Sequence, residues 1–357
     1  MVAKQQLIYR DKPVFGFDIG RSSIKIMQII EQNKSSQVLG YGTIAFDPKA
    51  IEDGVIVDPE MIIKAAYELI NKQLVGKITT NAVAVSLPNA QSFNRILTLP
   101  IMDQKDLAAS INLEASQSIP LPIEDLYYDY EVTKSIDEHN QEVQLAACPR
   151  KIIDSYVGVF DALGLELALV ESNISAVTRM VLHAEAHDVA TLIVDFGSTA
   201  CDLSICEGST IRATSTVDCS GDVITNLIAQ KLGVNNQQAQ SIKTRYGLEL
   251  SKKQDQVISA VAPELSKLIN EIKKVIRYFG EHTDGKNSIG QIIVLGGGAN
   301  LPGLSSYITD NVRIPTRLCA PWNNLTFGDL QPPHELETTL YTTAGGLSLI
   351  TPQGMKS

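Results

Sequence analysis

Long apolar runs are missing from this 357-residue sequence, and none approaches the roughly 20 residues that a membrane-spanning helix needs. The first twelve residues are polar and do not form the apolar core of a secretion signal. Both absences argue against a membrane-spanning or secreted chain. We therefore expect a cytoplasmic protein without direct membrane insertion, which reaches the inner membrane only when a partner recruits it.

Cys-x-x-Cys pairs are also missing, although the sequence has five cysteines. An odd number of scattered cysteines does not make a disulfide framework. Most of them have apolar neighbours, which is typical of reduced cysteines in a hydrophobic core. We expect all of them to be buried and structural: Cys148, Cys201, Cys206, Cys219 and Cys319.

The sequence has few positive charges: 30 Lys and Arg residues against 40 Asp and Glu residues give a net charge of −10. Binding to a nucleic-acid backbone relies on clustered Lys and Arg, so we expect no nucleic-acid partner. One basic cluster, Lys273, Lys274 and Arg277, lies in a predicted helix. We predict that it forms a helix surface, with an acidic groove as an alternative partner.

The chain is too long for one hydrophobic core, so we expect two or more domains. Strand-like runs alternate with helix-length segments, which indicates an α/β protein. The predicted strands cover 14–18, 23–30, 82–87, 92–99, 126–135, 143–147, 167–170 and 288–295, with a strand–turn–strand series from residue 191. The predicted helices cover 59–74, 102–118, 151–163, 174–187, 223–232, 237–243 and 257–279, and a last one opens at 301–309.

An approximate internal duplication is the most informative pattern. Residues 14–25 run from an apolar strand through an Asp-x-Gly turn at Asp18 into hydroxyl residues and a second strand, and residues 192–202 repeat this order at Asp195. A glycine permits the tight turn and lets backbone N–H groups face an anion. Each aspartate ends its strand, where it can hold a hydrated Mg²⁺ or orient water. The two copies predict phosphate-binding hairpins on two similar lobes that face one another across a cleft.

A third element is a buried apolar strand that runs into Gly296, Gly297 and Gly298. Three glycines bring backbone close to a flat ring or a phosphate, and we expect a helix with Pro302 near its first turn to follow. The pattern is not the Gly-x-Gly-x-x-Gly fingerprint, and no suitable acidic residue follows about 20 residues later. A Rossmann oxidoreductase is therefore disfavoured.

These three elements, in this order, resemble the phosphate 1, phosphate 2 and adenosine motifs of the actin-like ATPases, which have a two-lobed, ribonuclease H-like α/β fold. Further stretches resemble the PilM family of type IV pilus assembly proteins, and the similarity covers about 13–350. They are 15–25, 99–102, 114–130, 147–150, 170–172 and 344–347. The resemblance implies subdomain 1A in 13–79, 166–190 and 336–350, an inserted FtsA-type subdomain 1C in 80–165, subdomain 2A in 191–235 and 288–335, and subdomain 2B in 236–287.

The same resemblance implies that ATP and Mg²⁺ are bound. It assigns Asp18 and Asp195 to Mg²⁺, through water, and to any catalysis. Glu171 is a further catalytic candidate that could orient the attacking water, although a place in a helix N-cap explains it equally well. The implied nucleotide contacts come from both hairpins, a later loop, an Ala-Glu-x-x-Lys-like pattern and the glycine turn: Gly20, Arg21, Ser22, Ser23, Lys25, Gly197, Ser198, Thr199, Gly221, Gln240, Lys243, Gly296, Gly297, Gly298 and Asn300. By the resemblance, Lys243 contacts the ribose and adenine, and the glycine turn with Asn300 flanks the adenine.

Three positions depart from the family pattern. Arg21 replaces a small residue and either reaches a phosphate or crowds the pocket. Gln240 replaces a glutamate, which reduces a carboxylate on two ribose hydroxyls to an amide, and Ser220 replaces a glycine. We therefore predict nucleotide binding in preference to rapid turnover, with slow hydrolysis at most.

The family implies an ATP-binding scaffold of type IV pilus assembly that docks the cytoplasmic N-terminal peptide of an inner-membrane, PilN-like protein between subdomains 1A and 1C. The tail after residue 350 does not read as the amphipathic membrane helix of FtsA, which favours recruitment through a partner. Two alternatives stay open: an FtsA-like, self-associating filament protein, and a sugar or acetate kinase of the same superfamily. A kinase needs a catalytic aspartate beside a polar pocket in the first lobe, and none is evident.

His183 and His187 are four residues apart on a predicted helix, a spacing that suits zinc. The glutamate between them is displaced by one position from the metalloprotease pattern His-Glu-x-x-His. We predict a solvated pair in preference to a metal site.

Overall fold

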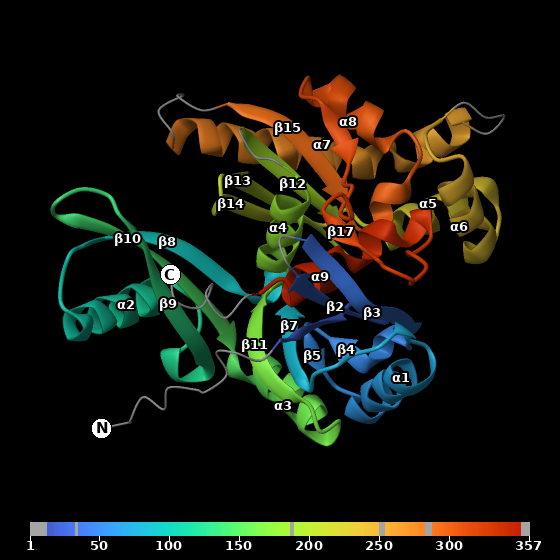
Figure 1. Cartoon of the computed structure of the whole chain (residues 1–357). Helices are drawn as coiled ribbons and strands as arrows, with labels where there is room; N and C mark the ends of the chain where they lie inside the picture. Colours follow the sequence, from blue (N-terminus) through green and yellow to red (C-terminus); the bar gives the residue numbers. More distant parts are fainter. Residues whose placement is uncertain (1–12, 33–34, 186–188, 250–253, 283–287, 351–357) are drawn as a thin grey trace. The chain divides into compact units, whose positions relative to one another are not determined.

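The computed structural model describes residues 13–32, 35–185, 189–249, 254–282 and 288–350, and the chain divides into two compact units (Figure 1). The described residues of unit 1 fall within 1–28, 39–173 and 347–357, and those of unit 2 fall within 29–38 and 174–346. The predicted helix end at His187 and the tail after residue 350 lie outside the described residues.

The main sheet of unit 1 has the strand order β11-β7-β1-β2-β3. The central strand β1 (Phe15–Ile19) pairs in parallel with β7 (Ala82–Leu87), which pairs in parallel with β11 (Glu166–Ser172). On its other side β1 pairs antiparallel with β2 (Ser23–Gln32), and β3 (Ser35–Ala45) is next. The carboxyl ends of three parallel strands therefore meet at one edge of this sheet.

Two helices of unit 1, α1 (Pro59–Lys72) and α3 (Arg150–Ala162), pack in the hydrophobic cluster on one face of this sheet. Phe160 of α3 meets Phe17 of β1 edge to face, with 5.0 Å between ring centroids. Because successive strand side chains alternate, Asp18 faces the opposite side of the sheet from Phe17. Short strands complete this part: β4 (Ile51–Glu52), β5 (Val55–Ile56) and β6 (Val75–Gly76).

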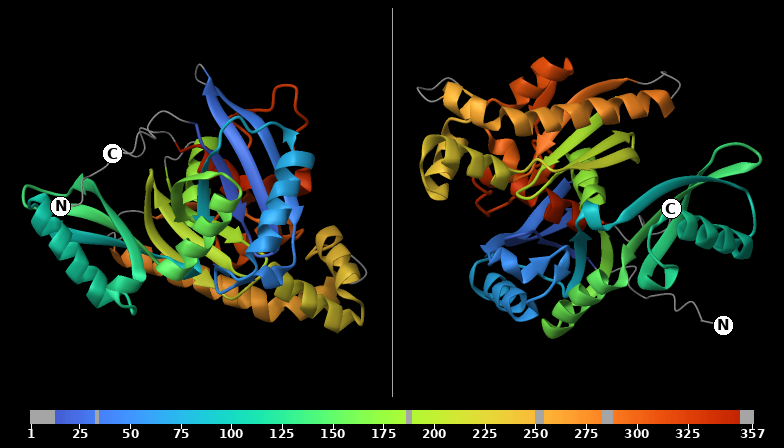
Figure 2. Two further views of the ribbon diagram at one scale, coloured as in Figure 1. Left: turned by 90° about the horizontal axis from the view of Figure 1, so that it is seen from below. Right: turned by 180° about the vertical axis from the view of Figure 1, so that it is seen from behind.

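A separate antiparallel sheet in unit 1 has the order β8-β10-β9, and α2 lies along it (Figures 1 and 2). Leu107, Ile111 and Ala115 of α2 share a hydrophobic cluster with Val143 and Leu145 of the middle strand. The bounds are β8 (Phe93–Pro100), α2 (Gln104–Ser118), β9 (Leu126–Ser135) and β10 (Asn140–Pro149). Within the predicted module 80–165, β7 and α3 thus pack with the main sheet, and the remaining elements form their own sheet. The boundaries of subdomain 1C and of the other three subdomains stay a prediction.

The sheet of unit 2 has the order β14-β13-β12-β15-β16. The central strand β12 pairs antiparallel with β13 and in parallel with β15, and β15 pairs in parallel with β16. Unit 1 has the same order and the same directions around β1 and β7, so the duplication in the sequence is a duplication of topology. The bounds are β12 (Ala190–Phe196), β13 (Cys201–Glu207), β14 (Thr210–Val217), β15 (Ile289–Leu295) and β16 (Thr316–Leu318). A further strand, β17 (Leu325–Thr326), pairs with Ser36 and Gln37 of β3, which fall in the 29–38 range of unit 2.

Helices cover both faces of the unit 2 sheet. Val177 and Val181 of α4 (Asn173–Ala184) cluster with Ile193 of β12, whereas the neighbouring Leu192 and Val194 belong to the larger cluster on the other face. That larger cluster includes residues from α5 (Gly221–Leu232), α6 (Asn236–Arg245), the long α7 (Gln254–His282) and α8 (Leu304–Val312). The last helices are the 3₁₀ segment η6 (Glu335–Tyr341) and α9 (Thr342–Ser348). No helix among the described residues is long and apolar enough to cross a bilayer.

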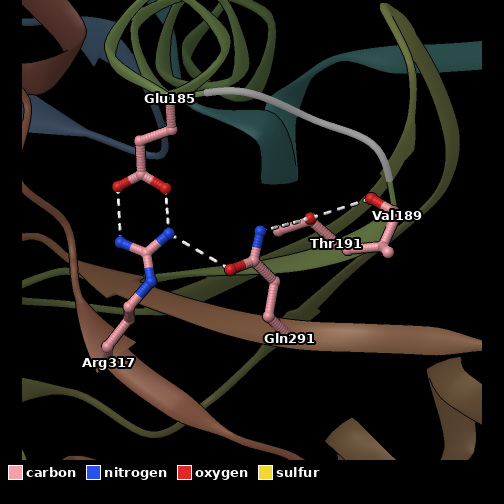
Figure 3. Close-up of polar contacts among 5 residues, drawn as sticks. All are labelled: Glu185, Val189, Thr191, Gln291 and Arg317. Carbon is pink, nitrogen blue, oxygen red and sulfur yellow. Dashed lines mark hydrogen bonds and ion pairs between the residues drawn. The ribbon is translucent and has the colours of Figure 1, made fainter.

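The end of α4 is tied to this sheet by a polar network (Figure 3). Both terminal nitrogens of Arg317 in β16 donate hydrogen bonds to the Glu185 carboxylate, and one of them also donates to Gln291 at 3.1 Å. Gln291 in turn donates to the Thr191 hydroxyl at 3.1 Å. Since the Glu185 side chain is only 7% exposed, the paired arginine satisfies a carboxylate that is nearly buried.

Most predicted elements are present with shifted ends, and the cysteine prediction is confirmed because all five are free and buried. Burial raises the pKa of Cys148 and Cys219 to about 12. The basic cluster lies exposed on α7, as predicted, where Lys274 pairs with Glu271 at 3.1 Å. The helix predicted from residue 301 begins only at Leu304, because Gly303 takes φ +82° as its N-cap.

Candidate functional site

The first Asp-x-Gly hairpin, hairpin 1, joins β1 to β2 in unit 1. The Asp18 carboxylate receives Lys25 Nζ at 3.2 Å on one oxygen and the Ser86 hydroxyl at 3.1 Å on the other. The Asp18 and Lys25 side chains are each 13% exposed, so the ion pair is shielded from water but not buried. Gly20 closes the turn by donating its N–H to the Ser23 carbonyl at 3.0 Å.

The parallel strands of unit 1 place Glu171 near this carboxylate. Glu171 of β11 lies beside Ser86 of β7 in the sheet register, and Ser86 bonds to Asp18 of β1. Adjacent residues in a parallel sheet project to the same face, so three polar side chains gather at the carboxyl ends of three strands. Glu171 lies near the end of β11, two residues before α4 begins at Asn173, so both the catalytic role and the helix N-cap alternative stay predictions.

The other predicted residues of hairpin 1 have contacts inside unit 1. Arg21 is exposed, and its guanidinium donates to the Ile51 carbonyl at 3.3 Å. The Ser22 carbonyl accepts the Phe46 N–H at 2.9 Å. The Arg21 guanidinium is therefore bonded within its own unit in this structure. Ser22 and Ser23 are half-buried, and they are the hydroxyl residues of the turn.

The second hairpin, hairpin 2, joins β12 to β13 in unit 2 and is held by α5. Gly197 closes the turn by donating to the Ala200 carbonyl at 3.0 Å. The first N–H groups of α5, from Gly221 and Asp222, donate to the carbonyls of Gly197 and Ser198, both at 3.0 Å. These helix donors are thus used by the hairpin, and Ser198 and Thr199 form its half-buried to exposed tip.

Behind hairpin 2, two α6 side chains converge on α5. Lys243 Nζ donates to the Gly221 carbonyl at 2.9 Å and to the Thr225 hydroxyl at 2.8 Å. The Thr225 hydroxyl lies 2.9 Å from Gln240 Oε1. Lys243 is only 7% exposed, and this burial lowers its pKa to about 8. Both residues were predicted to meet the ribose, and here both are turned toward Thr225.

The three-glycine turn lies against hairpin 2. Gly296 has φ +84°, and a β-carbon there would collide with the Asp195 carboxylate and the Phe196 carbonyl. A β-carbon at Gly298 would lie 2.7 Å from the Phe196 ring, and one at Gly297 would lie 3.2 Å from Leu340. The Asn300 amide donates to the Leu336 carbonyl at 2.6 Å. The first and third glycines are therefore required by packing within unit 2, and contacts of this turn with a base stay a prediction.

Two residues that support these hairpins from neighbouring elements were not predicted, namely Ser86 of β7 and Thr225 of α5. Ser86 is a polar residue near the end of an otherwise apolar strand, but the strand was assigned to the inserted module instead of beside β1. Thr225 interrupts the apolar side of α5 four residues after Gly221. A hydroxyl on an otherwise apolar face is the signal that could have identified either residue.

The histidine prediction is wrong for His183, which is not solvated. Its imidazole Nε2 lies 2.9 Å from the Ser36 hydroxyl, and burial lowers the pKa of the half-buried ring.

Over the described ranges, no group of three or more His, Cys, Asp or Glu side chains has the arrangement of a metal site. The Asp18 carboxylate fits a Mg²⁺ ion held through water, because each of its oxygens accepts one hydrogen bond and keeps a lone pair for a water donor.

Two units of the same topology, each with an Asp-x-Gly hairpin after its central strand, define the actin-like ATPase fold. A family model described as type IV pilus assembly protein PilM matches residues 16–351. The chain belongs to this family.

Known proteins of the same class share the fold at low sequence identity. The cell division protein FtsA of Pseudomonas aeruginosa is 23% identical over 278 residues, which cover 68% of this chain and only 62% of that relative. A solved PilM-PilN type IV pilus biogenesis complex matches with a TM-score of 0.81 and 21% identity, over 95% of this chain and 98% of that one. MreB5 of Spiroplasma citri bound to AMPPNP matches with a TM-score of 0.56 and 12% identity, over 97% and 98%.

Proposed function

We propose that this chain is an ATP-binding, actin-like scaffold of type IV pilus assembly. The observation that carries the proposal is the pair of duplicated hairpins, each with an aspartate near the end of a central strand and a glycine turn after it. Membership of the PilM family supports the pilus role, and a similar fold bound to AMPPNP in MreB5 supports the ligand. Family membership also disfavours a sugar or acetate kinase.

In this proposal each hairpin and the glycine turn supply nucleotide contacts. The hairpin N–H and hydroxyl groups bind phosphate oxygens, and the glycine turn with Asn300 approaches the base. Asp18 and Asp195 would hold the waters of a Mg²⁺ ion, which would supply positive charge to the phosphates. Glu171 is our candidate to orient a water, and we expect any hydrolysis to be slow, because the sequence suggests no activating residue beyond Asp18, Asp195 and Glu171.

A partner peptide would link the nucleotide to the membrane. We infer that the cytoplasmic N-terminal peptide of a PilN-like inner-membrane protein docks between subdomains 1A and 1C, and that it recruits the chain to the inner membrane. The PilM-PilN complex of similar fold supports this partner. Nucleotide binding would then bias peptide binding by favouring one conformation of the scaffold.

Titration calorimetry with Mg-ATP tests the nucleotide. We expect wild-type binding and a loss of at least about tenfold in affinity for Asp195→Ala, because a carboxylate that orients Mg²⁺ waters is removed. Asp310→Ala, at an exposed position of α8, is the control and should bind as wild type. Absence of wild-type binding, or equal binding by Asp195→Ala, would contradict the proposal.

Peptide binding is tested separately, by fluorescence anisotropy of a labelled N-terminal peptide of the PilN-like protein with a scrambled peptide as control. Binding of the native peptide alone is expected. No binding with or without Mg-ATP would remove the partner and leave the nucleotide result standing. Self-association, the alternative that the sequence left open, is tested by sedimentation at rising protein concentration with ATP.

A further inference from the structure

Lys243 is a buried cation whose hydrogen-bond partners are neutral. Its ammonium donates to a carbonyl and a hydroxyl, and within the described part of the chain no carboxylate forms an ion pair with it. Burying a charge without a counter-charge is unfavourable. The lowered pKa, about 8, reports this penalty, which the charge of Asp222 on α5 opposes only in part. Such a cation gains stability when an anion binds nearby.

The cation lies directly behind hairpin 2. A β-carbon at Gly221 would be 3.5 Å from Lys243 Nζ, 3.4 Å from the Gly197 carbonyl oxygen and 3.9 Å from Ser198 Cα. Gly221 therefore separates the ammonium from the hairpin by one residue, receiving Lys243 on its carbonyl and donating its N–H to Gly197. Gly221 is also the first residue of α5, so the partial positive charge of the helix N-terminus lies beside hairpin 2 as well.

Thr225 holds this arrangement together. Its hydroxyl accepts from Lys243 and lies within hydrogen-bond distance of both the Gly221 carbonyl, at 2.8 Å, and Gln240 Oε1, at 2.9 Å. Thr225 is 7% exposed, so these bonds are shielded from water. The network leaves the Lys243 ammonium oriented toward α5 and hairpin 2.

We propose that Lys243, oriented by Thr225, is a positioning residue for the phosphate end of an anionic ligand, acting through Gly221 on hairpin 2, and that it does not contact ribose or base. The inference rests on the proposed nucleotide function. It differs from the role expected from the family resemblance, which placed Lys243 at the ribose and adenine.

Affinities for ATP and for inorganic tripolyphosphate separate the two roles. Lys243→Met is expected to weaken both ligands equally, by at least about tenfold, because the lost charge acts on phosphate. Lys231→Met, at the exposed end of α5, is the matched control and should leave both affinities unchanged. An unchanged affinity for tripolyphosphate, or a wild type that binds ATP but not tripolyphosphate, overturns the inference.

The number of protons taken up when ATP binds distinguishes an electrostatic role of Lys243 from a purely structural one, which would not change it. The pKa of Lys243 is about 8, so at this pH part of the ligand-free protein has a neutral Lys243 side chain. A nearby anion favours the charged form. Wild-type ATP binding in two buffers of different ionisation enthalpy should therefore take up as much as about half a proton, and Lys243→Met should not. Equal uptake by both proteins contradicts the inference.

A second pair of variants applies if Lys243→Met does not fold. Thr225→Val removes the hydroxyl and should weaken both ligands, whereas Thr225→Ser keeps it and should bind as wild type. Equal affinities for this pair overturn the inference. A wild type that binds no ATP overturns the proposed function and this inference together, while wild-type binding with no effect of any variant overturns the inference alone.

Discussion

Hairpins 1 and 2 have the same sequence pattern and the same topology, yet they are stabilised in different ways. In hairpin 1 the aspartate is held by side chains, the Lys25 ammonium and the Ser86 hydroxyl. In hairpin 2 the backbone is held by the first N–H groups of α5, and the lysine stands behind that helix. In unit 1 the Lys25 ammonium bonds directly to the aspartate. In unit 2 the Lys243 ammonium bonds to the Gly221 carbonyl of α5, and the Gly221 N–H bonds to hairpin 2.

This difference shows that a duplicated motif fixes a turn but not its environment. The Asp18–Lys25 pair lies in the partly exposed setting where ion pairs contribute little to stability. Lys243 lies in a buried setting, where its charge is unfavourable until an anion compensates it. We therefore expect hairpin 2 to be the more sensitive of the two to mutation and to pH.

The largest expected effect is a pH-dependent one at Lys243. Its folded-state pKa of about 8 lies below the ordinary value of 10.5, so between these values the unfolded chain binds more protons. Stability of the wild type relative to Lys243→Met should therefore rise with pH across this window, by about 3 kcal/mol in full. Urea unfolding of both proteins at several pH values measures it, and parallel pH profiles would contradict the assigned burial.

A methyl group added to each hairpin glycine is expected to give the next largest difference. At Gly197 a β-carbon would lie 2.8 Å from the Ala200 carbonyl oxygen, which is backbone. At Gly20 it would lie 2.8 Å from the end of the Lys25 side chain, and the nearest backbone atom, the Ser23 carbonyl oxygen, would be 3.3 Å away. Gly197→Ala should cost about 2 kcal/mol and Gly20→Ala less than about 1 kcal/mol. Urea unfolding measures both, and equal costs would remove the proposed asymmetry.

The smallest expected effect concerns the Ser86 hydroxyl beside Asp18. Ser86→Ala removes one hydrogen bond to a partly exposed carboxylate and should destabilise the protein by about 1 kcal/mol. Ser259→Ala, on the exposed side of α7, is the control and should be neutral. A thermal unfolding midpoint equal to that of the control would mean that Asp18 is held by Lys25 alone.

Local patterns predicted much of this architecture. The Asp-x-Gly turns, the strands that flank them and the buried cysteines follow from short stretches of residues and from burial preferences, and the structure confirms them. Predictions failed where a distant segment decides the environment. His183 was predicted to be solvated, but Ser36, 147 positions away, packs against its ring.

The two strand–turn–strand hairpins could be predicted from the residues alone, because each is encoded in one continuous stretch, and the resemblance of further stretches added the actin-like fold and the PilM family. The surroundings of each turn depend on the tertiary fold. Ser86 reaches Asp18 because β7 pairs in parallel with β1, and Lys243 lies behind hairpin 2 because α6 packs on α5. Parallel pairing and helix packing join residues far apart in the chain, and no local pattern encodes which strands and helices become neighbours.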